Sequence, residues 1–478
     1  MREVEIEAVS LDRLSSLLSL ARVQRVAEYS ALARELLAGR VVWNVNATAS
    51  GGGVAEMLQA LLAYARGTGV ETRWLVLDGT PDFFTLTKRL HNLLHGSPGD
   101  RGPMGDEERA TYESVLTANV GQLRDRVSPG DFVLLHDPQT AGLVVPLRDA
   151  GAHVIWRSHI GRDTGNEFTE TGWEFLRPYV GSAEATVFTR TAYVPDWLPP
   201  EETRIIPPSI DPFTAKNMLL ADPEVHATLR RAGLVDLPDI SGEITFARRD
   251  GTTGSVRSHS GIFATDGPVP GDVRYLLQVS RWDRLKDMGG VLTAFAGHLD
   301  AFPPDVHLVL AGPEVAGVAD DPEGKEVLEE CLGLWRTLPA ETQQRVHLAV
   351  LPMDDVDENA HLVNALQQHA SLVVQKSLVE GFGLTVTEPM WKARPVVASR
   401  IGGIQDQIVN GESGLLVDDP VDLTAFADAC VAVLSDSALA DRLGLAARER
   451  VRDLFIGDRQ LIQYVDLFAD LLAATGAR

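Results

Sequence analysis

Two carboxylates, Glu380 and Glu388, lie eight positions apart in the stretch "LVEGFGLTVTEPMWKARPVV". Paired carboxylates often serve as the acid and the base of a hydrolase. Here Glu380 ends the loop after the strand-like residues 371–376, and Glu388 is expected near the start of the following helix. Both carboxylates are then expected to face one cleft, with the N–H groups of Gly381 and Gly383 open to a ligand. The simpler alternative for Glu388 is ordinary complementation of the helix dipole.

Two cations, Arg281 and Lys286, stand just past another apolar run in "QVSRWDRLKDM". Cations at the carboxyl end of a strand suit a diphosphate, since one charge pair at about 4 Å and an effective dielectric of 20 is worth roughly 4 kcal/mol before desolvation. Isolated basic residues are more often only solvated. Their place at the strand end favours the phosphate interpretation.

A glycine run, Gly51, Gly52 and Gly53, lies between a strand-like segment and an amphipathic helix. Such a loop lets backbone N–H groups approach an anion, although a tight turn alone would also explain it. The run matches neither the dinucleotide-binding nor the P-loop pattern, which weakens both alternatives. His159, in "RSHIGRD", also ends a strand. A lone histidine there is more often a hydrogen-bonded structural residue. It becomes a candidate site residue only if its loop faces the loops of a second domain.

The elements that must position these residues form two series of apolar strands alternating with helices. This pattern predicts an α/β protein with two doubly wound, Rossmann-like domains facing across a cleft. We expect a first domain at 1–215 and a second domain at 216–457, with a helix at 458–478 packing back on the first. Residues 239–272, rich in Gly, Ser and Thr, predict hairpins or a mobile surface insertion. The strands are expected at 41–47, 72–79, 131–138, 153–160 and 185–190, then at 274–281, 307–313, 345–352, 371–376 and 395–399.

Composition excludes several classes of protein. The 478 residues carry 43 Lys and Arg against 67 Asp and Glu, a net charge of −24, which disfavours nucleic acid and anionic membranes as partners. Two cysteines are too few for a disulfide framework or a zinc cluster. The acidic start, "MREVEIEAVSLDRL", lacks the features of a signal peptide, so we expect a cytoplasmic protein. The oligomeric state is left open, a homodimer included.

The motif "EGFGLTVTE", together with Arg281, Lys286 and the glycine loop, resembles the retaining nucleotide-sugar glycosyltransferases of the two-Rossmann-domain (GT-B) type, a group that includes glycogen and sucrose synthases. More narrowly, "SGGGVAEML", "FFTLTKRLHNLLHG", "WEFLRPYV", "IIPPSIDPFTAKN", "DDPEGKE" and "GGIQDQIVNGESGLLV" are similar to trehalose-forming glycosyltransferases. The resemblance runs from about residue 41 to 455. It departs in the insertion, in "HIGRDTGNEF" and at Pro389, which puts the acceptor in doubt more than the reaction type.

The resemblance implies a role for each donor residue. Arg281 and Lys286 would neutralise the diphosphate, Glu380 would hold sugar hydroxyls, Glu388 would hold the ribose hydroxyls, and His159 would sit beside the transferred sugar. It implies retaining transfer without a protein nucleophile, a cofactor or a metal ion. The remaining donor-binding residues would be Gly52, Gly53, Gly381, Phe382, Gly383 and Leu384.

With the donor held by the second domain, the acceptor is expected on the first, near 83–92 and 158–163. Lys88, His91 and Asn92 would bind it, and Phe83 or Phe84 would stack on its ring. The expected reaction joins a nucleotide-activated glucose to free glucose. The alternatives are a phosphorylase that uses sugar 1-phosphate, a transferase acting on a modified sugar or an aminocyclitol, and a catalytically silent binder.

Overall fold

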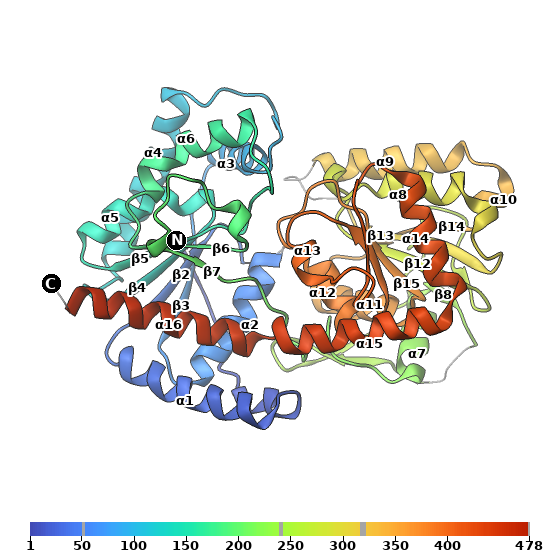
Figure 1. Cartoon of the computed structure of the whole chain (residues 1–478), viewed down its shortest axis with the longest axis horizontal. Helices are drawn as coiled ribbons and strands as arrows, with labels where there is room; N and C mark the ends of the chain where they lie inside the picture. The colour runs from blue at the N-terminus through green and yellow to red at the C-terminus, as the bar shows by residue number, and fades with distance from the viewer. Residues whose placement is uncertain (50–52, 239–241, 316–321, 477–478) are drawn as a thin grey trace. The chain divides into compact units, whose positions relative to one another are not determined.

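The computed structural model describes residues 1–49, 53–238, 242–315 and 322–476. The chain divides into two compact units, one formed by Met1–Ser209 with Phe455–Arg478 and the other by Ile210–Leu454 (Figure 1). The sequence put the division after residue 215. The C-terminal segment therefore belongs to the same unit as the N-terminus.

The sheet of the first unit has the strand order β1-β3-β2-β4-β5-β6-β7. All its strands pair in parallel except β1, which runs antiparallel to β3. The order reverses between β2 and β4, and ligands of doubly wound sheets bind beyond the strand ends at such a switch point. The strands expected from the sequence are present, and the short edge strands β1 and β7 are additions. The bounds are β1 Arg2–Val4, β2 Val42–Asn46, β3 Thr72–Val76, β4 Phe132–His136, β5 His153–Arg157, β6 Ala185–Phe188 and β7 Thr203–Ile205.

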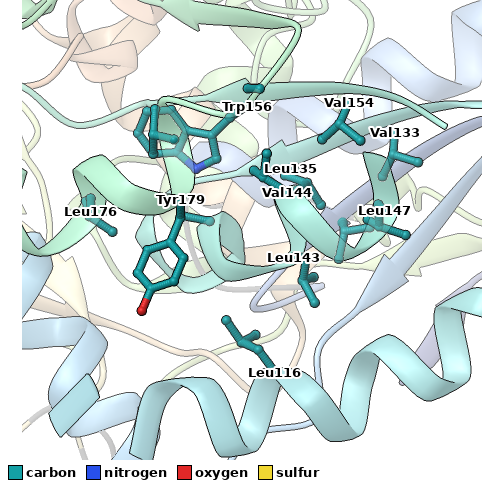
Figure 2. Close-up of a cluster of buried hydrophobic side chains, with 14 of the residues drawn as sticks. Leu116, Val133, Leu135, Leu143, Val144, Leu147, Val154, Trp156, Leu176 and Tyr179 are labelled. Carbon is teal, nitrogen blue, oxygen red and sulfur yellow. The ribbon is translucent and has the colours of Figure 1, made fainter. Parts of the chain in front are cut away.

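Helices cover both faces of this sheet because side chains alternate between the faces along each strand. Val133 and Leu135 of β4 join Val154 and Trp156 of β5 in one core (Figure 2). The opposite face packs against α16, which buries Tyr464, Val465 and Phe468 there. The C-terminal helix is thus part of the first unit's core. The helices are α1 Leu20–Leu36, α2 Gly53–Gly67, α3 Pro81–Leu94, α4 Asp106–Arg124, α5 Val144–Asp149, α6 Glu167–Val180 and α16 Gly457–Gly476.

The sheet of the second unit is parallel throughout, in the order β14-β13-β12-β15-β16-β17. Its switch point falls between β12 and β15, the strands that precede the two predicted donor segments. The short edge strand β17 was not expected. The strands are β12 Arg274–Val279, β13 Val306–Pro313, β14 Val346–Leu351, β15 Leu372–Gln375, β16 Val396–Ser399 and β17 Leu415–Val417. The helices are α7 Asp222–Ala232, α8 Met288–Gly297, α9 Pro322–Arg336, α10 Ala340–Gln343, α11 Val356–His369, α12 Leu384–Trp391, α13 Ile404–Gln407, α14 Leu423–Ser435 and α15 Ser437–Leu454.

The described part of the insertion contains an antiparallel hairpin, β9 Thr245–Ala247 with β10 Thr253–Ser255, and a strand β11 Val269–Pro270 that pairs with β8 Val235–Asp236. Ion pairs fasten it to α11. The backbone N–H and Nε of Arg257 donate to the fully buried Glu358 at 2.7 and 2.6 Å. The expected hairpin is present in the described residues 242–272.

In the described part of the chain, no single helix combines the length and the apolar composition that crossing a membrane requires. Helices α14 and α15 pass such a test only as a pair, and they meet at a bend of 101°. α14 buries Phe426, Cys430 and Val433 in the core of the second unit, so this pair has the packing of core helices.

Candidate active site

The switch point of the second sheet brings two predicted donor residues together. Lys286 closes the short turn η5 (Arg284–Lys286) after β12, and Glu380 lies in the loop between β15 and α12. Lys286 Nζ donates to Glu380 Oε2 at 2.6 Å, with side chains 17% and 9% exposed. A charge-assisted hydrogen bond shielded in this way fixes both groups in place.

Arg281 lies on the same loop, two residues past β12, but in a different environment. Its side chain is 53% exposed and pairs with Asp283 through an Nη2–Oδ2 contact of 3.1 Å. An exposed pair of this kind contributes little to folding. Arg281 is therefore placed where a ligand anion in solvent can reach it.

The loop 381–383, which follows Glu380, is shaped by close contacts. Gly383 has a φ of +84° and caps α12, and a Cβ on it would lie 3.2 Å from Glu380 Cγ and Ile404 Cγ1. The Phe382 ring is buried, and the backbone carbonyl of Phe382 accepts a hydrogen bond from Gln407 Nε2 at 2.5 Å. Leu384 opens α12. The loop thus holds Glu380 through backbone geometry that a larger residue at Gly383 would disturb.

Glu388 is the fifth residue of α12 and is buried. The helix-dipole interpretation required it to lie in the first turn, so that interpretation is wrong. Its Oε1 lies 3.2 Å from Lys216 Nζ, and its Oε2 accepts from Gln367 Nε2 at 3.1 Å. Gln367 in turn accepts from Lys392, whose pKa burial lowers to about 7. The two glutamates therefore have different partners, and sequence reasoning missed Lys216, Gln367 and Lys392.

In the first unit, His159 belongs to a hydrogen-bonded chain that the sequence analysis did not foresee. His136 Nε2 lies 3.0 Å from Asn44 Oδ1, and His136 Nδ1 lies 3.1 Å from His159 Nε2. With the amide oxygen of Asn44 as acceptor, His136 donates through Nε2 and accepts from His159 at Nδ1. This tautomer leaves His159 Nδ1 as an acceptor for a ligand hydroxyl.

Burial sets the charge of these groups. Burial, aided by the nearby Arg157 cation, lowers the pKa of His136 to about 3 and holds that of His159 well below its ordinary value, so both rings are neutral at pH 7. Asp137, whose Oδ1 accepts from the His159 N–H at 2.7 Å, has a pKa raised to about 7 by burial. It also adopts a φ of 65°, uncommon for a residue with a side chain. Backbone strain and a raised carboxyl pKa in one residue are typical of functional sites.

The predicted phosphate loop is covered only in part. Gly52 lies outside the described residues. Gly53 is the first residue of α2, the helix that follows β2 in the sequence, and is exposed. That position keeps the prediction of an anion at this helix start open.

The predicted stacking face differs for its two phenylalanines. Phe83 is fully buried and stacks on Tyr112 at 5.8 Å, so its assignment as a sugar-stacking residue is wrong. Phe84 is 38% exposed and contacts Phe83 edge to face. Phe83 is part of the apolar face of α3, which leaves Phe84 for any contact with a ligand.

The predicted acceptor residues lie along the second half of α3. Lys88 is exposed, and His91 and Asn92 are half-buried. The loop after His159 reaches the end of this helix, since Arg162 Nη1 donates to the Gly96 carbonyl at 3.2 Å. The structure thus brings segment 158–163 next to Gly96, four residues beyond segment 83–92.

Comparison with known proteins identifies both units. Residues 44–195 match the family model described as "Trehalose synthase, N-terminal domain", and residues 264–450 match "Glycosyl transferases group 1". A trehalose synthase of Rubrobacter xylanophilus is 35% identical over 95% of this chain and 96% of its own. A trehalose phosphorylase of Pleurotus pulmonarius is 25% identical over 85% of this chain and 54% of its own.

Among solved structures, the UDP-forming α,α-trehalose-phosphate synthase of Burkholderia vietnamiensis superposes with a TM-score of 0.65 at 16% identity, covering 91% of this chain and 98% of that one. At such identity the likeness concerns the fold, two Rossmann-like units of the GT-B type, as the sequence predicted. The relationship itself rests on the 35% identity along nearly the whole chain. The chain therefore belongs to the trehalose synthase family, and it is a hexosyltransferase.

Proposed function

We propose that the protein transfers a glucosyl unit, with retention of configuration, from a nucleoside diphosphate sugar to a small sugar acceptor, and that with glucose as acceptor it makes trehalose. The observation that carries this proposal is the Lys286–Glu380 pair, held at 2.6 Å at the switch point of the second sheet, with Arg281 on the same loop as Lys286. Two cations and a carboxylate suit a sugar diphosphate, because the cations can bind the phosphates and the carboxylate can accept hydrogen bonds from the sugar hydroxyls. The trehalose synthase relative supports the same reaction.

In the proposed mechanism the diphosphate leaves as the sugar develops oxocarbenium character. Arg281 and Lys286 stabilise the charge growing on the leaving group, and such preorganised groups often supply the largest part of catalysis. The departing phosphate oxygen takes the proton of the acceptor hydroxyl, which enters on the same face. Glu380 orients Lys286 and accepts hydrogen bonds from the sugar, and Glu388 holds the ribose hydroxyls.

The first unit supplies the remaining contacts in this proposal. His159, neutral and accepting at Nδ1, would take a hydrogen bond from a hydroxyl of the transferred sugar. Lys88, His91 and Asn92 would bind the acceptor. We infer that Gly53, at the start of α2, places its backbone N–H near the donor phosphates.

The second candidate is a phosphorylase that uses glucose 1-phosphate, favoured by the Pleurotus relative. Turnover with glucose and each of UDP-, ADP-, GDP- and dTDP-glucose, compared with turnover on glucose 1-phosphate, separates the two. We expect a disaccharide and a nucleoside diphosphate from at least one nucleotide donor. A disaccharide formed only from glucose 1-phosphate would select the phosphorylase, and a panel of modified sugars and aminocyclitols tests the acceptor.

We also propose that the reaction needs no cofactor or metal ion, because the two cations supply the charge that a divalent ion would otherwise bring. Full activity in excess EDTA is the expected result, and loss that added Mg²⁺ restores would contradict it.

We place the enzyme in the cytoplasm. Sedimentation analysis decides between a monomer and a homodimer.

A further inference from the structure

Lys376 is a buried cation that the mechanism above does not use. It follows β15 directly, and its side chain is 1% exposed. Its Nζ donates to Asp287 Oδ2, the residue immediately after Lys286. Because the Lys376 ammonium is already paired with Asp287, we expect its effect on the reaction to pass through that partner.

Asp287 determines the course of the chain beyond Lys286. It has φ and ψ of 49° and 45°, a left-handed conformation unfavourable for a residue with a side chain. Its Oδ1 accepts from the Gly290 N–H at 3.1 Å and so caps α8. A Cβ on Gly290 would lie 2.1 Å from Asp287 Oδ2, so the chain leaves room for this carboxylate. Asp287 is therefore fixed from two sides, by α8 and by Lys376.

Further hydrogen bonds join the same two segments. Gln278 of β12, fully buried, donates through Nε2 to the Lys286 carbonyl at 2.7 Å and accepts from the Lys376 N–H at 3.2 Å. The Leu378 N–H donates to the Leu285 carbonyl at 2.7 Å. The loop that carries Glu380 and the turn that carries Lys286 are thus linked at their backbones as well as at their charged ends.

We propose that Lys376, acting through Asp287, is a positioning residue that holds the Lys286 ammonium against Glu380 and in line with the donor diphosphate. This inference rests on the proposed function of Lys286. The turn η5 has only three residues, and Asp287 joins it to α8. A shift of about 1 Å in a catalytic group can reduce the rate about 10²-fold. The buried Lys376–Asp287 pair prevents such a shift.

A double-mutant cycle tests the inference. We expect Lys376→Met to lower kcat about 10- to 100-fold with little change in the acceptor KM, and Lys376→Arg to restore part of it. In a Lys286→Met background the same substitution should change kcat less than twofold, because the group it positions is gone. Equal losses in both backgrounds would overturn the inference. If Lys286→Met alone leaves kcat intact, the proposed function fails instead.

Two further variants separate positioning from folding. Asp287→Asn keeps the size of the side chain and its capping oxygen but removes the charge, so it should reproduce the loss in kcat even if Lys376→Met does not fold. Arg257→Met breaks another ion pair to a buried carboxylate, that of Glu358 in the same unit. We expect it to lower Tm while kcat stays within twofold. A kcat loss in Arg257→Met that matches that of Asp287→Asn would reduce Lys376 to a structural residue.

Discussion

Three cations within six residues allow the donor clamp to be tested with a matched control. Arg281 and Lys286 are assigned to the diphosphate, and Arg284 stands between them. Arg284 is 49% exposed, close to the 53% of Arg281, but it pairs with glutamates of α9, its Nη2 lying 2.7 Å from Glu330 Oε1. Replacing each by methionine removes the charge and keeps much of the side-chain volume.

The expected loss of rate follows from the charge removed. A transition-state charge donor of this kind is worth about 10²- to 10³-fold in kcat, or roughly 2.7–4 kcal/mol. We expect that loss for Arg281→Met and for Lys286→Met, and less than a twofold change for Arg284→Met. Arg284→Met then differs from each of the other two variants by at least about 50-fold in one assay.

Stability should follow a different order. Arg281→Met removes an exposed ion pair and should change the free energy of unfolding by less than about 0.5 kcal/mol. Lys286→Met leaves the shielded Glu380 carboxylate without its cation, which costs about 1–3 kcal/mol, or roughly 2–10 °C in Tm for a unit of this size. Initial rates of nucleoside diphosphate release and thermal melts measure both. The reasoning is refuted if Arg281→Met and Lys286→Met both keep kcat within threefold, or if Arg284→Met loses as much as they do.

Three other outcomes are expected. Glu388→Gln should weaken the thermal stabilisation by nucleoside diphosphate while leaving that by pyrophosphate unchanged, because the carboxylate is assigned to ribose; equal losses would contradict this role. Lys88→Ala and His91→Ala should raise the acceptor KM several-fold without affecting donor binding, and an effect confined to the donor or to Tm would refute the assignment. The free energy of unfolding should fall as the pH drops from about 6.5 to 4, by up to roughly 1.4 kcal/mol per pH unit for each buried histidine, since these histidines take up protons only on unfolding. The histidines concerned are His136, with a pKa of about 3, and His347, His361 and His369, with pKa values of about 4. The raised pKa of Asp137 acts in the opposite direction, but it is one group against four. Urea titrations showing constant stability over this pH range would contradict the prediction.

Strand prediction from the sequence succeeded for the interior of both sheets and for the six-residue edge strand β14, and it failed at the other three edges. Interior parallel strands are covered on both faces and therefore appear as continuous apolar runs. The edge strands β1, β7 and β17 have three residues each, too few to show a period. In α3, helical periodicity could have predicted which of the two phenylalanines is buried. Phe83, Leu86 and Leu90 share one helical face and are buried, whereas Phe84 lies outside that face.

The site divides in a similar way. Lys286 and Glu380 were identified because each follows a recognisable strand, and parallel strands bring their carboxyl ends to one edge. The chain Asn44–His136–His159 was missed because it joins residues 92 and 23 positions apart. The available signals were Asn44 inside the apolar strand β2 and a His-Asp pair, His136 and Asp137, at the end of β4. For Lys216, which pairs with Glu388, no local pattern pointed to the contact.

The central claim is most directly tested by following the wild-type reaction of nucleoside diphosphate glucose with glucose by ¹H NMR. The account predicts α,α-trehalose as the first disaccharide formed, with one nucleoside diphosphate released per molecule and little donor hydrolysis when glucose is omitted. It also predicts that a variant carrying both Arg281→Met and Lys286→Met forms none at a measurable rate. A β-linked first product, or release of free glucose without any disaccharide for every nucleotide donor, would contradict it.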